Sequence, residues 1–195
     1  MNKLNQLINN FKNDINFIEI LPYIFLPISF VMGSAILNFN IILIVIFFLY
    51  VCFKTKKWSF IHEKLFLWLI IFYAFFVINS IYSYFLFEEK NLEKVIKSIF
   101  FIKFIILIFA TNYFLSKKNN LQIVNLIWLL ISLFIAFDII FEKNFGKNIL
   151  GFESHDQLRI VSFFKDELIV GGFLLCFGFS SITFFLDNCN KKMKL

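Results

Sequence analysis

Residues 65–87 read LFLWLIIFYAFFVINSIYSYFLF, an apolar stretch without a single charged side chain. A transmembrane helix needs about 20 mostly apolar residues to cross roughly 30 Å of hydrocarbon, and this stretch is long enough. The rest of the chain has the same character, because 60% of its 195 residues are hydrophobic, against about 45–50% in soluble domains. We therefore expect an all-α integral membrane protein.

The chain offers six such stretches, which predict a polytopic transmembrane helical bundle forming one membrane domain over residues 1–195. Only Asn38–Asn40 separates the first two, which is typical of a tight helical hairpin. Before them, the apolar residues of Met1–Phe17 recur at helical spacing and predict a short N-terminal amphipathic helix on the membrane surface, or else a helical lead-in to the first span. The predicted spans are 18–37, 39–54, 65–87, 95–115, 122–141 and 168–187, with an outer loop at 142–166.

The basic residues predict the orientation of these spans. With the N-terminus inside, eleven lysines fall on the cytoplasmic side and seven basic residues on the other. Cytoplasmic loops carry the excess of lysine and arginine, so we expect an N-in, C-in topology. The net charge of +6 then reflects topology signals and contacts with membrane lipids. No nucleic-acid partner is expected.

The stretch 150–172, LGFESHDQLRIVSFFKDELIVGG, gathers the candidate functional residues. It holds Arg159, the only arginine among nineteen basic residues. A guanidinium can grip a phosphate through two parallel hydrogen bonds, although Arg159 could equally anchor the loop or pair with a nearby aspartate. Asp166 and Glu167 open the last span, where an acidic residue either caps the helix or acts as a general base.

Further candidates lie inside the spans. Lys103 lies within the fourth span, where a lysine is costly and therefore functional or paired by default. Lys97 lies nearer the interface and could reach the same cavity, while Asp138 is the natural counter-charge for Lys103 or Arg159. Gly171, Gly172 and Gly178 would let the last helix approach its neighbour closely. The scattered cysteines and histidines predict neither a metal site nor a cofactor.

The order of these residues resembles the O-antigen ligase and O-antigen polymerase-like membrane proteins. The resemblance is carried by the basic residue inside the fourth span (Lys103), by FDIIFEKNFGKNILGFES at 137–154 and by RIVSFFKDELIVGGFLL at 159–175. It implies a metal-independent glycosyltransferase-type enzyme of lipopolysaccharide and cell-envelope polysaccharide synthesis. Such an enzyme lies in the bacterial inner membrane with a periplasmic active face.

In that family, a glycan passes from an undecaprenyl-diphosphate carrier to a hydroxyl of lipid A-core or of another lipid-linked glycan. The resemblance implies that Arg159, with Lys103 or Lys97, holds the diphosphate. It also implies that Glu167 or Asp166 orients or deprotonates the acceptor hydroxyl.

Members of the family are about twice as long and carry a second large periplasmic loop. We therefore expect this chain to correspond to the N-terminal half only, with the remaining spans missing or supplied by a second polypeptide. A non-catalytic membrane scaffold, an assembly subunit or a truncated inactive fragment is the alternative. A small transporter would explain Lys103 and Asp138 inside spans, but we see no sign of the broken helices or duplicated halves of that class.

Overall fold

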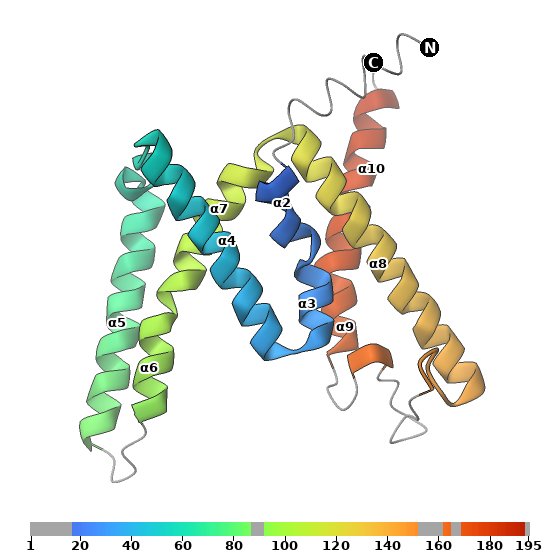
Figure 1. Ribbon diagram of the computed structural model, residues 1–195, viewed down its shortest axis with the longest axis horizontal. Helices are drawn as coiled ribbons and strands as arrows, with labels where there is room; N and C mark the ends of the chain where they lie inside the picture. Colours follow the sequence, from blue (N-terminus) through green and yellow to red (C-terminus); the bar gives the residue numbers. More distant parts are fainter. Residues whose placement is uncertain (1–16, 87–91, 152–161, 165–168, 194–195) are drawn as a thin grey trace. The chain divides into compact units, whose positions relative to one another are not determined.

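The computed structural model describes residues 17–86, 92–151, 162–164 and 169–193. The secondary-structure elements in these ranges are all helices, which confirms the all-α prediction (Figure 1). The predicted N-terminal amphipathic helix and part of the outer loop 142–166 lie outside the described residues. Five of the described helical stretches are long and apolar enough to cross a membrane. They are α4 (Ser34–Thr55), α5 (Lys64–Leu86), α6 with α7 (Leu92–Phe100 and Ile102–Leu115), α8 (Lys118–Phe145), and the run of α9, η3 and α10 (Val170–Phe173, Leu174–Phe179 and Ser180–Met193).

The described residues fall into two compact units. Unit 1 combines the residues up to Asn40 with those from Lys117 onward, and unit 2 consists of Ile41–Ser116. The helix α4 begins in unit 1 and continues into unit 2.

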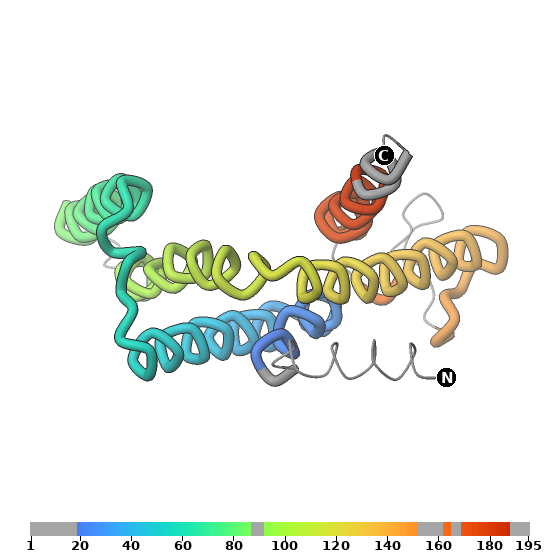
Figure 2. The backbone as a smooth tube through the Cα atoms, turned by 90° about the horizontal axis from the view of Figure 1, so that it is seen from above, coloured from blue at the N-terminus to red at the C-terminus, as the bar shows by residue number. Residues whose placement is uncertain are grey.

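Unit 1 is built on α8, which Figures 1 and 2 show as one long helix. Its buried side chains include Val124, Ser132, Ile135, Asp138 and Glu142. Spacings of three, four and eight residues place this set on one face of the helix. The short helices α2 (Phe17–Ile24) and α3 (Leu26–Met32) pack on α8, as do η3 and α10.

The core of unit 1 is aromatic. Phe164, Phe173 and Phe177 form a buried cluster with Ile135 of α8. Phe30 of α3 packs against all three of these rings, with centroids 6.0 to 6.3 Å apart. Edge-to-face and tilted ring pairs at these distances add to the stability gained from burial. Residues from the start and the end of the chain thus share one core.

The first predicted span, 18–37, is divided into α2 and α3 by a turn at Phe25. Pro27 removes one helical bond there, because it has no N–H to donate to the carbonyl four residues earlier, that of Tyr23. The indole Nε1 of Trp128 on α8 donates to this Tyr23 carbonyl oxygen at 2.8 Å. A side chain from another helix therefore replaces the bond that proline deletes, as the membrane interior demands.

The connection between the first two helical segments also differs from the prediction. The predicted hairpin turn at Asn38–Asn40 is wrong, because α4 begins at Ser34 and runs through all three residues. The chain turns instead at Gly33, whose φ of 111° is a conformation that glycine adopts without steric cost. Asn40 is accommodated inside α4 because its Nδ2 donates to the Pro22 carbonyl at 2.9 Å. This bond, distant in sequence, overrides the turn preference of asparagine.

The C-terminal helical run contains the π-helix η3, which widens the backbone next to α8. Hydroxyl groups from the following turn bind its carbonyls: Ser181 Oγ donates to the Phe177 carbonyl at 2.7 Å. A Cβ atom added at Gly178 would lie 3.4 Å from the Cβ of Ser132 on α8. The close approach of η3 to α8 therefore needs a small residue at position 178.

In unit 2, α5 has no buried residue although most of its side chains are apolar. Trp68 is 70% exposed and Phe85 is 75% exposed. Soluble monomers rarely expose an apolar surface that runs along a whole helix. Lipid chains cover such a surface at no cost, so α5 has the character of a membrane helix.

The fourth predicted span, 95–115, also contains a break, at Phe101 between α6 and α7. Here the amide of Phe101 bonds the Ser98 carbonyl at 3.2 Å, which is a three-residue turn. Tyr73 on α5 donates from its hydroxyl to the carbonyl of Ile99 at 2.8 Å. As at the first break, a side chain from another helix binds backbone oxygen next to the irregularity.

We expect Trp128→Phe to destabilise the protein by about 1–3 kcal/mol, because the partly buried Tyr23 carbonyl loses its donor while most of the ring packing is kept. The matched control is Trp68→Phe, which changes an exposed indole on α5 and should stay within about 0.5 kcal/mol of wild type. Thermal unfolding in detergent or nanodiscs measures both midpoints. Equal midpoints for the two variants would contradict the role assigned to the indole N–H.

Candidate functional site

The last turns of α8 carry two acidic residues on one face. Asp138 and Glu142 are four residues apart, so their side chains lie above one another on the helix surface. Both are buried, with Asp138 0% exposed and Glu142 3% exposed. Buried carboxyl groups are costly unless they are hydrogen-bonded, so their partners define the site.

Both acids bind Ser162, which lies in the short 3₁₀ helix η2 (Ser162–Phe164). The Ser162 amide donates to Oε2 of Glu142 at 2.6 Å, and the Ser162 hydroxyl donates to Oδ2 of Asp138. The backbone of Ser162 has a φ of 51°, a left-handed conformation that is uncommon outside glycine. Such strain persists where surrounding contacts hold the residue in place, as these two carboxyl groups do.

The chain leaving α8 completes the site. Gly146 ends the helix with a φ of 72°, and its amide donates to the Glu142 carbonyl at 2.8 Å, as in an αL cap. The returning chain brings Asn148 against Ser162, whose carbonyl accepts from Asn148 Nδ2 at 2.9 Å. The amide of Ile149 donates to the second oxygen of Asp138 at 2.8 Å.

These contacts form one buried network, which we call the Ser162 clamp: Asp138, Glu142, Asn148 and Ser162. The amide, hydroxyl and carbonyl of Ser162 are all bonded. Both oxygens of Asp138 accept from neutral donors, an amide and a hydroxyl. Removing one member leaves a buried polar group without its partner. This costs more stability than replacing both partners by apolar groups of the same shape. The clamp therefore fixes Ser162 at the end of α8.

Of the predicted site residues, Arg159, Asp166 and Glu167 lie outside the described residues. Asp138 is described, and the partners given above are amide and hydroxyl groups of unit 1 rather than a lysine. What the structure does establish near Arg159 is the position of Ser162, three residues further along the chain.

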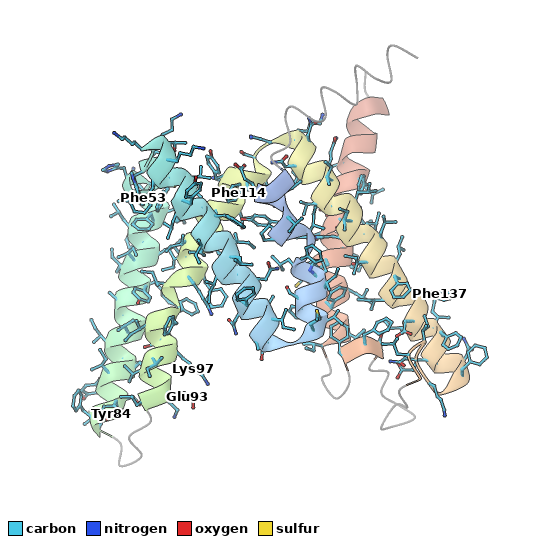
Figure 3. All side chains as sticks on the ribbon, in the orientation of Figure 1. Phe53, Tyr84, Glu93, Lys97, Phe114 and Phe137 are labelled. Atoms are coloured by element: carbon cyan, nitrogen blue, oxygen red, sulfur yellow. The ribbon has the colours of Figure 1, made fainter. Side chains whose placement is uncertain are left out.

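The two predicted lysines lie in unit 2, on opposite sides of the break at Phe101. The Lys97 side chain on α6 is 74% exposed and forms a salt bridge with Glu93 at 2.6 Å. Figure 3 labels both side chains on α6. Lys103 on α7 is partly buried, with its Nζ 5.2 Å from the ring centroid of Phe104. A cation over an aromatic face gains a modest electrostatic stabilisation.

Of the three glycines predicted to pack closely, only Gly178 has a neighbour on another helix among the described residues. Gly171 and Gly172 are exposed, and no described atom lies within 4 Å of a Cβ placed at either position. Gly178, seven residues after Gly171, makes the close approach instead, against Ser132 of α8. The packing role falls to Gly178 because the helix meets α8 at η3, two turns after the helix begins.

Sequence reasoning missed Glu142, Asn148 and Ser162. A signal for Glu142 was present, since it follows Asp138 at a spacing of four residues near the end of an apolar span. No comparable signal marks Ser162, because its partners lie 14 to 24 residues away across a loop. A turn serine and a buried serine with a positive φ are indistinguishable in one sequence.

Within the described ranges, no three histidine, cysteine, aspartate or glutamate side chains gather closely enough to hold a metal ion. The clamp forms hydrogen bonds that hold the chain at Ser162 in position.

No protein-family model, curated protein or solved structure matches this chain. The class that the fold and site define is an all-helical protein with membrane-length helices and a buried acidic clamp at the end of α8.

We expect Ser162→Ala to lower the free energy of unfolding by about 1–3 kcal/mol, because the buried Asp138 oxygen loses its hydroxyl donor. Ser180→Ala is the matched control, since Ser180 is exposed and bonds only carbonyls of its own helix among the described contacts. Its effect should stay within about 0.5 kcal/mol. Thermal unfolding of both purified variants tests this, and an undisturbed Ser162→Ala protein would show that the clamp adds no stability.

Proposed function

We propose that this chain takes part in transferring a glycan from an undecaprenyl-diphosphate carrier to an acceptor hydroxyl, in the manner of an O-antigen ligase or polymerase. The proposed location is the bacterial inner membrane, with the N- and C-termini in the cytoplasm and the active face in the periplasm. The distribution of lysines supports this orientation. The order of Lys103, the 137–154 segment and the 159–175 segment supports the reaction class.

The single structural observation that carries the proposal is the Ser162 clamp. It ties the chain three residues after Arg159 to the buried face of α8 through bonds to Asp138, Glu142 and Asn148. A catalytic group works only when it is held in a productive position, and loops need such anchoring. The clamp supplies a fixed point three residues along the sequence from the only arginine in the chain.

In the proposed reaction, the bond between the anomeric carbon of the glycan and a phosphate oxygen breaks. The electron pair leaves with the diphosphate, and the anomeric carbon forms a new bond to the acceptor oxygen. Arg159, with Lys103 or Lys97, stabilises the charge on the leaving diphosphate. Glu167 or Asp166 takes the acceptor proton. No metal or cofactor is needed for these steps.

Lys97 could bind the diphosphate only by giving up its ion pair with Glu93. Its ammonium group is bonded to Glu93 through an exposed pair four residues apart on α6. Exposed pairs of this kind are weak, so a diphosphate with more negative charge could displace the carboxylate. Lys103 is less exposed and contacts the Phe104 ring.

We expect Arg159→Ala to reduce glycan transfer by about 100-fold, because removing one well-placed charge-stabilising group costs about 10²–10³ in rate. The transfer rate of Arg159→Lys should lie between those of the wild type and Arg159→Ala, since lysine keeps the charge but lacks the planar guanidinium fork. Lys143→Ala, an exposed cation on α8, is the matched control and should keep wild-type activity. Transfer of a lipid-linked glycan in native membrane vesicles measures all three.

A scaffold or assembly subunit is the second candidate, supported by the exposed apolar side chains of α5, which has no buried residue. If the chain is a scaffold, glycan transfer depends on its close helix packing and not on the guanidinium of Arg159. Gly178→Leu should destabilise the protein by about 1–3 kcal/mol by driving a side chain into Ser132. Gly172→Leu is its control, because that position is open. Full transfer by Arg159→Ala together with loss of transfer in Gly178→Leu, but not in Gly172→Leu, would favour the scaffold over the enzyme.

A further inference from the structure

The turn between α4 and α5 carries a cluster of exposed lysines. Four lie within eleven residues, while Glu63 is the only acidic residue among them. None of the four takes part in an ion pair among the described residues. Their positive charge is thus not neutralised by the described part of the protein. The lysine turn, as we call it, consists of Lys54, Lys56, Lys57 and Lys64.

The lysine turn rests on a well-packed aromatic base. Phe60, in the 3₁₀ helix η1 (Ser59–His62), is buried. Its ring lies 5.3 Å from Phe48 and 5.5 Å from Phe66 and from Phe109, measured between centroids. Trp58 also stands edge-on to Phe53 at 4.8 Å. These contacts hold the turn in one conformation, which lowers the entropy lost when the lysines bind a partner.

Exposed aromatic side chains next to the lysines indicate where the turn lies relative to a bilayer. Tyr50 and Phe53 on the last turns of α4 are exposed, and Figure 3 shows Phe53 at the end of α4. The amphipathic ring of tyrosine favours the boundary between hydrocarbon and headgroups, and Tyr50 lies four residues before Lys54. The lysines that follow Phe53 therefore reach the headgroup layer, where the phosphates of lipids are found.

We propose that the lysine turn binds the headgroups of anionic phospholipids. Several unpaired ammonium groups on a fixed turn match a surface of singly charged phosphodiesters better than a zwitterionic one, in which choline or ethanolamine groups cancel the charge. On the topology expected from the lysines, this turn faces the cytoplasm. The proposal concerns the opposite side of the membrane from Arg159 and holds whether or not the chain transfers glycans.

The test measures binding of phosphatidylglycerol and phosphatidylcholine to the full-length protein in detergent, for example by native mass spectrometry. The wild-type protein should prefer phosphatidylglycerol, and added salt should reduce the preference. Lys54→Gln/Lys57→Gln should weaken phosphatidylglycerol binding by about 25-fold, since each of the two lysines contributes about a fivefold factor near an anionic surface. Phosphatidylcholine binding should not change.

Lys143→Gln/Lys147→Gln is the matched control, because it removes the same charge from two exposed lysines at the end of α8 and just beyond it, on the other side of the membrane in the expected topology. It should keep the lipid preference. A Lys57→Gln single variant gives a smaller loss in the same direction and covers the case in which the double variant unfolds. Equal binding of the two lipids by the wild-type protein, or equal losses in both double variants, would overturn the proposal.

Discussion

Backbone carbonyls next to helix breaks need donors, and this requirement explains much of the structure. Water is absent from the hydrocarbon core, so an unbonded carbonyl there costs several kcal/mol. Trp128 and Asn40 donate to carbonyls at the break between α2 and α3. Tyr73 does the same beside the break between α6 and α7. Each donor also links two helices that are distant in sequence. The hydrogen bonds that satisfy these carbonyls therefore also stabilise the tertiary structure.

Unit 1 is likewise organised around one face of α8, whose side chains make several of these contacts. Trp128 serves the first break, Ser132 meets Gly178, and Ile135 joins the aromatic core. Further along, Asp138 and Glu142 bind Ser162. These positions follow one another every three or four residues, so they lie on one face of α8. Going along the helix, this face first packs against other helices and then forms the hydrogen bonds that anchor Ser162. A change in the tilt or rotation of α8 would therefore disturb the core and the clamp together.

The sequence predicted the helical membrane character from long apolar runs, because that signal is local and strong. It failed where a distant partner decides the outcome. Asn38–Asn40 looked like a turn, yet the Pro22 carbonyl holds Asn40 within α4. Gly171, Gly172 and Gly178 all looked like packing residues, and the position of the crossing with α8 selects only Gly178 among them. Pro22 and Pro27 punctuate the first predicted span, but no proline marks the break at Phe101. The carbonyls at the helix breaks accept from tryptophan, asparagine and tyrosine side chains, so the presence of broken helices alone does not favour a transporter, in which unwound carbonyls coordinate ions.

The choice of neutral donors around Asp138 has a consequence for the proposed chemistry. A buried carboxyl group held by a lysine or arginine would consume a cation and lower the positive potential available to a diphosphate. Here the amide of Ile149 and the hydroxyl of Ser162 occupy both of its oxygens. The part of the clamp that the structure describes at Asp138 is thus built from neutral groups of unit 1. For the proposed reaction this is favourable, because a site that stabilises a leaving diphosphate gains when the groups that bind Asp138 are not themselves cations.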